Sequence, residues 1–499
     1  MDTTKEEKKK EQGAYRSIFK ATSLFGGVQV YNILIKIVKS KIVAVLLGPE
    51  GIGILGLLTS ATELTKSVTS MGLSQSAVRD VSEANGTNDI NRINQTVSVL
   101  RKLVWITGLL GTIVTACCAP LFSKFSFGNN EYIISFIILS VTLLIDQISA
   151  GQRVVLQGFR RLKDLSKSSV IGATLGLVFS VPIYYLYGKD GIVPTLVITS
   201  VSSLVISWYF SRKVKIDKVV LPIKEYFKYG RQMLVMGIAM SVSSILGHGV
   251  SYLIKGYISG SGGVSDVGIY QAGYAILTTY FGLIFSAIVT DYYPRLAAVN
   301  KDNEKCNKTV CQQGEITSMI IGPMLCLCLI LMPYILKLLY SDKFLLACPF
   351  VMWGCLGMIF KIASWLISYV FVAKAESKLF MLNELLANIY TLVFSIVGYK
   401  LWGIEGLGIA FFLNYVIYFL QVYIIAKIRY NFIFTRSFII NYLLMSTMVV
   451  AIFLILFFVD SNWKYVFASL VAVVSIVYSL YSLRNLLNFS LKDLKIFKK

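Results

Sequence analysis

The stretch LVFSVPIYYLYGKDG, residues 177–191, occurs a second time in this chain as LVFSIVGYKLWGIEG, residues 392–406. The two stretches align without a gap at a shift of 215 positions (392 − 177), and eight of their fifteen residues are identical. Gly53 and Ile54 recur at the same shift as Gly268 and Ile269, each pair after a short glycine-rich connection. The sequence therefore contains an internal duplication, and the duplicated segments are largely apolar.

The composition predicts an integral membrane protein with an all-α fold. Of the 499 residues, 56% are hydrophobic and 15% are charged, which is more apolar surface than a soluble domain can bury. Apolar runs of about 20 residues, the length that crosses a ~30 Å hydrocarbon core as a helix, recur along nearly the whole chain. We predict about 14 transmembrane helices. Their expected ranges are 18–47, 52–76, 103–123, 132–152, 168–187, 192–211, 232–259, 267–291, 314–340, 344–372, 379–401, 405–426, 438–459 and 464–483.

Basic residues alternate between the connections that join these spans. The N-terminal tail, the even-numbered loops and the C-terminal tail hold 36 Lys and Arg, whereas the odd-numbered loops hold four. This is the distribution that the positive-inside rule describes, so both termini are expected in the cytoplasm. The net charge of +22 is thus a topology signal, and nucleic acid is not an expected partner.

The repeat predicts two parallel six-helix lobes, because an even number of spans gives both copies the same orientation. We expect a cytoplasmic tail at 1–17, an N-lobe at 18–211, a basic cytoplasmic inter-lobe loop at 212–231 and a C-lobe at 232–429. Residues 430–499 are expected to form two extra spans and a cytoplasmic tail. Duplicated bundles of this kind are typical of secondary transporters, whose sites lie between the repeats.

Lysines within the spans are the main candidates for a binding site. A charge in a membrane helix is costly and usually faces a cavity, a partner or an ion path. Four such lysines lie in spans 1 and 2, and a fifth lies in span 7, the repeat counterpart of span 1. They predict a cationic cavity that suits a phosphate or diphosphate. The expected substrate-binding residues are Lys36, Lys39, Lys41, Lys66 and Lys255.

Two of these lysines have an alternative place. Span 1 has about thirty residues, or roughly 45 Å of helix at about 1.5 Å per residue, which exceeds the hydrocarbon thickness. Lys39 and Lys41 would then lie near the outer headgroups. Gly26 and Gly27 are candidates for a hinge in the same span, with close packing as the alternative.

Three further residues are candidates for ion coupling: Asp146, Glu63 and His248, the single histidine. Glu63 and Lys66 stand three residues apart on one helix, so mutual neutralisation is the alternative for that pair. A packed core residue is the alternative for His248. Lys361 in span 10 is expected to be structural and paired with an acid.

Enzyme chemistry is not expected. One histidine and scattered cysteines do not form a metal site, and no Gly-Lys-Ser/Thr motif follows the glycine-rich turn at 48–51, so an ATP site is not expected either. The eight cysteines give no disulfide framework. We therefore expect a transporter without cofactors that is coupled to H⁺ or Na⁺.

Residues 24–80 resemble the start of bacterial O-antigen and polysaccharide flippases. These lipid-linked oligosaccharide translocases belong to the multidrug/oligosaccharidyl-lipid/polysaccharide exporter (MOP) superfamily. The resemblance rests on GGVQV at 26–30, on VAVLLGPEGIG at 43–53 and on GLSQSAVRD at 72–80. The repeat and the number of spans extend it over the whole chain.

The resemblance implies a flippase that moves an oligosaccharide repeat unit on undecaprenyl diphosphate across the bacterial cytoplasmic (inner) membrane by alternating access. The product would serve O-antigen, capsule or exopolysaccharide assembly, with a polysaccharide polymerase and chain-length machinery as partners. Relatives carry basic residues in the first two helices and the seventh, where this chain has its lysines. Two alternatives stay open. A cation-coupled multidrug exporter would need an acidic cavity, and a membrane polysaccharide polymerase would need longer outer loops.

Overall fold

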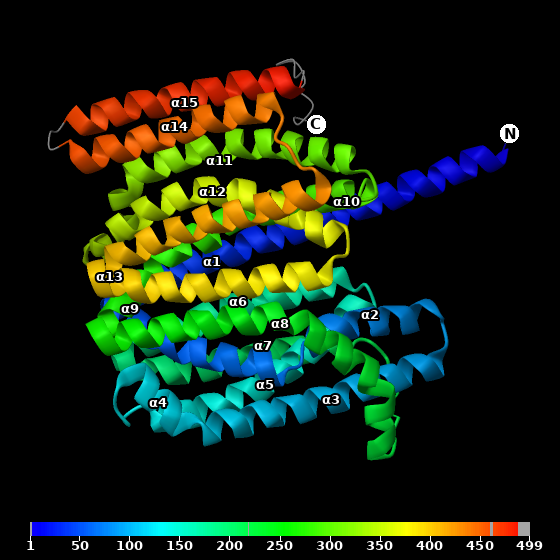
Figure 1. Ribbon diagram of the computed structural model, residues 1–499. Coiled ribbons are helices and arrows are strands. Elements are labelled where there is room, and N and C mark those ends of the chain that lie inside the picture. The colour runs from blue at the N-terminus through cyan, green and yellow to red at the C-terminus, as the bar shows by residue number, and fades with distance from the viewer. Residues whose placement is uncertain (1, 218, 460–462, 488–499) are drawn as a thin grey trace. The chain divides into compact units, whose positions relative to one another are not determined.

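The computed structural model describes residues 2–217, 219–459 and 463–487, and within them every regular element is a helix (Figure 1). The all-α expectation is therefore confirmed. The chain forms two compact units, Met1–Ser265 and Asp266–Lys499. The first holds spans 1–7, whereas the expected N-lobe ends with span 6, so the lobe boundaries stay a prediction.

The first unit is built around long helices that pack side by side. Its α5 packs between α3 and α7, and its α1 packs against α6 and α8. The elements of this unit are α1 (Asp2–Thr69), α2 (Leu73–Gly86), α3 (Ile90–Cys117), α4 (Ala119–Phe127), α5 (Ile133–Gly158), α6 (Leu162–Tyr187), the 3-10 turn η1 (Gly188–Gly191), α7 (Ile192–Ser211) and α8 (Ile223–Gly262).

The second unit centres on α11 and α12. The α12 helix packs along α13, and α11 contacts α12, α14 and α15; α14 and α15 lie side by side in Figure 1. The elements are α9 (Val264–Ala275), which begins at the unit boundary, the π-helical turn η2 (Ile276–Tyr280), α10 (Phe281–Ala298), α11 (Asn303–Leu339), the 3-10 turn η3 (Asp342–Ala347), α12 (Cys348–Ala373), α13 (Ser377–Tyr430), α14 (Arg436–Phe458) and α15 (Trp463–Leu487).

The described helices account for the expected number of spans. Ten helical segments are long and apolar enough to cross a membrane, or eleven if the bent pair Lys224–Ile238 and Met240–Gly262 is one span. Three of the ten have 43, 50 and 54 residues, more than twice the ~20 residues that one crossing needs. Each of these three covers two predicted spans and is interrupted at a glycine. Counted as two spans each, and with the bent pair counted as one more span, they bring the total to the predicted fourteen.

Those interruptions repeat at the shift found in the sequence. Gly48 (φ 67°, ψ −168°) and Gly263 (φ 92°, ψ 170°) are 215 residues apart and share a backbone conformation. Gly188 (φ 55°, ψ −129°) and Gly403 (φ 57°, ψ −136°) form a second such pair. Their angles are near those of the first central position of a type II′ turn, which favours glycine. The backbone therefore confirms the internal duplication.

We expect Gly403→Ala to destabilise the chain by about 1–2 kcal/mol, because an L-residue is strained at this φ and ψ. A Cβ added at Gly403 meets no atom within 4 Å, so backbone strain is the only cost. Gly282→Ala in α10 is the matched control: its Cβ is equally uncrowded, and its φ is helical. Thermal unfolding of the purified variants in detergent should show a lower midpoint for Gly403→Ala alone. Equal midpoints would contradict the turn assignment.

The segment that joins α7 to α8 is hydrogen-bonded to α3. Asn94 Nδ2 donates to Asp217 Oδ2 at 3.4 Å, and Asp217 N donates to Asn94 Oδ1 at 3.1 Å. Val219 N donates to Ser98 Oγ at 3.1 Å, and Tyr226 Oη donates to Val219 O at 3.3 Å. Asp217 and Val219 of the expected basic loop are thus held along the first turns of α3, whereas the part of that loop from Ile223 onward belongs to α8.

The α3 helix shows why span ends are hard to place from hydropathy alone. It begins at Ile90, ahead of the predicted start at 103, because the Asp89 carboxylate caps it by accepting from Asn91 N at 2.9 Å and Arg92 N at 3.3 Å. It ends at Cys117, before the predicted end at 123, where a proline-containing short helix, α4, takes over. Caps and breaks, which are local features, set both ends.

Candidate functional site

Lys255 on α8 points at the second arm of α1, the part that follows the break at Gly48. Its Nζ donates to Ser60 Oγ at 2.6 Å, and Ser60 Oγ in turn donates to Gly56 O at 2.5 Å. Glu63, one turn further along α1, is the carboxylate whose charge acts on Lys255. The predicted contribution of span 7 to the site is therefore a half-buried ammonium held by a serine hydroxyl and facing one acid.

The short helix α4 covers the same part of α8. The Phe125 ring lies against Gly256, where an added Cβ would come within 2.1 Å of the ring. Tyr252, one turn earlier, shares a hydrogen bond of 3.0 Å with Ser126. These contacts fix the rotation of α8 about its axis, and this rotation turns Lys255 toward Ser60.

Lys66 pairs with Asp146 on α5 rather than with Glu63. Lys66 Nζ lies 3.3 Å from Asp146 Oδ2, and the two side chains are 38% and 35% exposed. The alternative in which Glu63 and Lys66 neutralise each other is therefore not what the structure shows. One predicted binding residue and one predicted coupling residue contact each other directly.

Arg153 is a further candidate residue that the sequence analysis missed. It was assigned to a cytoplasmic loop, but α5 extends to Gly158 and includes it. Its Nη1 donates to Ser149 Oγ and to Ser203 Oγ, both at 3.1 Å, and the Asp146 charge acts on it. Asp146 and Arg153 are seven residues apart and so share a helix face, which is the signal that would have revealed the pair.

Lys36 and Lys39 occupy the first arm of α1 without a carboxylate partner among the described residues. Lys36 is exposed and Lys39 is half-buried. Val43 and Leu47 follow Lys36 by seven and eleven residues on the same helix face, and they are only 2% and 7% exposed. This face of α1 is therefore buried near the break at Gly48 and exposed at Lys36.

Lys41 lies on a different side of α1 from Lys36 and Lys39. It borders an apolar groove of about 470 Å³ that Pro182 and Tyr185 of α6 line on the other side. The structure therefore divides the five predicted lysines. Lys36 and Lys39 lie together on the first arm, Lys66 and Lys255 each contact an identified partner, and Lys41 belongs to a groove between α1 and α6.

His248 lies on the same face of α8 as Lys255, seven residues earlier. Its Nδ1 is buried and has no hydrogen-bond partner within the described part of the chain. The neighbouring Gly249 faces Leu64 of α1, so the histidine lies beside the α1–α8 contact. Its role in ion coupling stays a prediction.

The structure shows no break in the helix at the two hinge candidates. The α1 helix continues through Gly26 and Gly27 and is interrupted only at Gly48. A Cβ at Gly27 would meet no atom within 4 Å, so close packing does not explain that glycine.

Lys361 lies over the rings of Phe285 and Tyr415, at 5.5 and 5.2 Å from their centroids. The expected acid partner is replaced by aromatic faces.

Comparison with protein families decides the affiliation of the chain. The model of a family described as polysaccharide biosynthesis protein matches residues 42–349, and that described as lipid II flippase MurJ matches residues 224–476. Each match covers more than half of the chain. The chain belongs to both families. It is a multi-pass membrane protein of the MOP superfamily, as the motifs at 24–80 predicted.

Individual relatives of this MOP-superfamily protein agree with that affiliation. It is 20% identical over 400 residues to the lipid III flippases of Escherichia coli K12 and of Shigella flexneri, with 76% of this chain and 91% of each relative covered. The structure of lipid II flippase MurJ in an inward closed conformation superposes with TM-score 0.67 at 15% identity, covering 94% of this chain and 100% of that one. An inward-facing MATE multidrug resistance transporter gives 0.66 at 16% identity, covering 81% and 98%. These structures show the fold that the chain shares.

Proposed function

We propose that this chain is a flippase that moves a lipid-linked oligosaccharide across the cytoplasmic membrane. Its family membership and its relatives named as flippases support a transporter rather than an enzyme. The observation that carries the proposal is the set of lysines in α1 and α8, of which Lys36 and Lys39 have no acid partner in the described chain. Unpaired cations within a membrane helix are costly unless they bind something anionic.

A diphosphate is the substrate group that fits these residues. The lysines of the first unit offer point charges with three rotatable donors each, and a diphosphate supplies several acceptor oxygens. We propose undecaprenyl diphosphate as the carrier, with the glycan in water and the prenyl tail in lipid, and alternating access as the mechanism. The product would feed a surface-polysaccharide polymerase and its chain-length machinery, with both termini of the flippase in the cytoplasm.

A multidrug exporter for cationic compounds is the main competing function. The likeness to MATE structures is a likeness of fold at 15–16% identity. A binding site for a cationic drug needs carboxylates whose charge no lysine of the protein balances, whereas Asp146 is paired with Lys66 and the Glu63 charge acts on Lys255. The described site therefore has an excess of positive charge, which favours an anionic substrate.

We propose Asp146 as the coupling group, with Glu63 and His248 as its alternatives. Asp146→Asn is expected to lower transport about tenfold and to remove its dependence on the proton or sodium gradient, because a neutral amide cannot take up the ion and leaves Lys66 unpaired. The readout is flipping in proteoliposomes with an imposed gradient. Asp80→Asn, which removes the acid of the Arg79–Asp80 pair at 2.8 Å, is the control and should transport normally.

The double variant Lys66→Gln with Asp146→Asn separates coupling from simple neutralisation. If the pair only balances charge, removing both members restores transport. If each residue has its own task, the double variant transports no better than either single one. Full restoration would remove Asp146 and Lys66 from the site.

The proposed function is tested in the host by deleting the gene and extracting its lipids. A membrane-impermeant reagent that modifies glycans reports which leaflet holds any lipid-linked repeat unit. A flippase predicts accumulation protected on the inner face and loss of surface polymer. Accumulation on the outer face would indicate a polymerase, and new sensitivity to cationic drugs without accumulation would indicate a multidrug exporter.

A further inference from the structure

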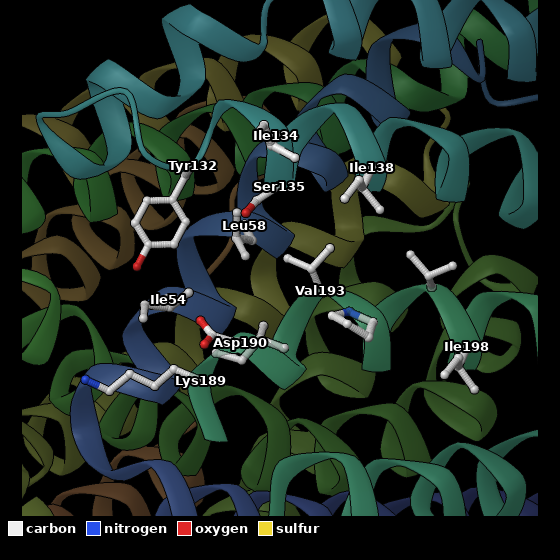
Figure 2. Close-up of a pocket in the computed structure, with 13 residues that line it drawn as sticks. Ile54, Leu58, Tyr132, Ile134, Ser135, Ile138, Lys189, Asp190, Val193 and Ile198 are labelled. Carbon is white, nitrogen blue, oxygen red and sulfur yellow. The ribbon is translucent and has the colours of Figure 1, made fainter. Parts of the chain in front are cut away.

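A second pocket of the first unit lies at the end that the charge distribution predicts to be outside. Its volume is about 490 Å³, and it is bordered by the second arm of α1, the start of α5, η1 and the start of α7. Figure 2 shows that it has two ends. Tyr132, Lys189 and Asp190 gather at one end, and aliphatic side chains such as Val193 and Ile198 line the other.

The polar end carries more negative than positive charge. Burial, followed by the charges of Glu50, Glu131 and Asp190, raises the pKa of the Tyr132 hydroxyl. Lys189 is the cation in the lining, and its Nζ lies 2.5 Å from Glu50 Oε2. Of the three carboxylates only Asp190 lines the pocket, whereas Glu50 is paired with Lys189 and Glu131 precedes Tyr132 in the chain. The Asp190 carboxylate, with these two further acids beside it, disfavours a diphosphate and favours a head group that brings a positive charge.

The walls of this pocket are held by contacts between its lining and residues outside the lining. The Glu50–Lys189 pair ties the turn after Gly48 to η1. The Tyr132 ring stacks on Phe127 of α4, with centroids 3.8 Å apart and planes 15° apart. The pocket is thus preformed, which lowers the cost of binding.

We propose that this pocket binds a phospholipid with a primary ammonium head group, of the phosphatidylethanolamine class, from the outer leaflet. The ammonium donates hydrogen bonds to the Asp190 carboxylate and the Tyr132 oxygen. The phosphate accepts from the Lys189 donors that Glu50 does not use, since an ammonium has three. One acyl chain lies along the aliphatic wall formed with Val193 and Ile198.

Head-group selectivity tests this assignment. Purified, delipidated protein in detergent is given phosphatidylethanolamine, phosphatidylcholine or phosphatidylglycerol, and retained lipid is counted by native mass spectrometry. Phosphatidylethanolamine should be retained best, because phosphatidylcholine has no N–H donor and phosphatidylglycerol has no positive charge. Tightest retention of phosphatidylglycerol, or of a prenyl diphosphate, would overturn the proposal.

Two variants locate the lipid in the pocket. Asp190→Asn should weaken retention of phosphatidylethanolamine about threefold to fivefold, the upper range of an exposed ion pair, and Val197→Trp, which fills the apolar end, should remove the bound lipid. Asp342→Asn and Val205→Trp are the matched controls: Asp342 pairs with Lys337 outside this pocket, and Val205 lies on α7 outside the lining. Unchanged retention in Asp190→Asn and Val197→Trp would contradict the proposal. The test measures binding alone, so its outcome is independent of the flippase assignment.

Discussion

Neutralising Lys36 and Lys39 together is expected to abolish transport without destabilising the chain. Neither lysine forms an ion pair with a described residue, so Lys36→Gln with Lys39→Gln removes a desolvation cost and breaks no stabilising contact. A charge at the centre of a membrane helix costs about 2.5–3.5 kcal/mol on insertion scales. Losing two hydrogen bonds to a charged substrate, at about 1.5–3 kcal/mol each, lowers transport at least about a hundredfold.

Flipping in proteoliposomes and thermal unfolding in detergent are measured on the same preparation. The control replaces Lys124 and Lys400, two exposed lysines outside the proposed site, by glutamine, and it should transport normally. A double Lys36/Lys39 variant that transports at the normal rate would remove the first arm of α1 from the site. A variant that unfolds at a markedly lower temperature would show that the two lysines are structural.

Replacing Lys255 by glutamine is expected to have the next largest effect, and here stability should fall as well. The change removes the ammonium that donates to Ser60 at 2.6 Å and leaves Glu63 without its facing cation. Removing one partner of a buried charge interaction costs up to about 3–5 kcal/mol, and less at this half-buried site. Transport should fall by about a hundredfold or more because the α8 contribution to diphosphate binding is lost.

A second variant separates these two consequences of losing Lys255. Ser60→Ala keeps the cation and removes only its hydroxyl acceptor, so transport should fall less than tenfold. Adding Glu63→Gln to Lys255→Gln removes the uncompensated carboxylate and should restore much of the stability but none of the transport. Recovery of transport in that double variant would mean that Lys255 only balances Glu63.

The sequence predicted the duplication and the cationic residues because both depend on periodicity and composition. Charges are rare in membrane helices, so each lysine within a span is visible without a structure. The 215-residue shift is equally visible, and it appears again in the paired glycines Gly188 and Gly403. Even the non-glycine residues Arg160 and Ala375, at the same shift, share a positive φ of 53° and 58°.

Partners across helices were not predictable in the same way. Whether Lys66 meets Glu63 on its own helix or Asp146 on α5 depends on how the two helices are rotated, which no single-sequence pattern determines. Arg153 was missed because the hydropathy pattern placed the end of span 4 at residue 152, whereas the α5 helix continues to Gly158. The positions of Asp217 and Val219 were not predictable because they are held by Asn94 and Ser98, two side chains of a helix more than a hundred residues away.

Recognition of the diphosphate by the lysines is the central claim, and one transport measurement tests it most directly. The purified chain is reconstituted in proteoliposomes with a fluorescent oligosaccharide on prenyl diphosphate, or with the same oligosaccharide joined to the prenyl chain without phosphates. We predict transfer of the diphosphate lipid, no transfer of the phosphate-free analogue, and loss of transfer in Lys255→Gln. Equal transfer of both lipids, or transfer of neither by a folded preparation, would contradict the account.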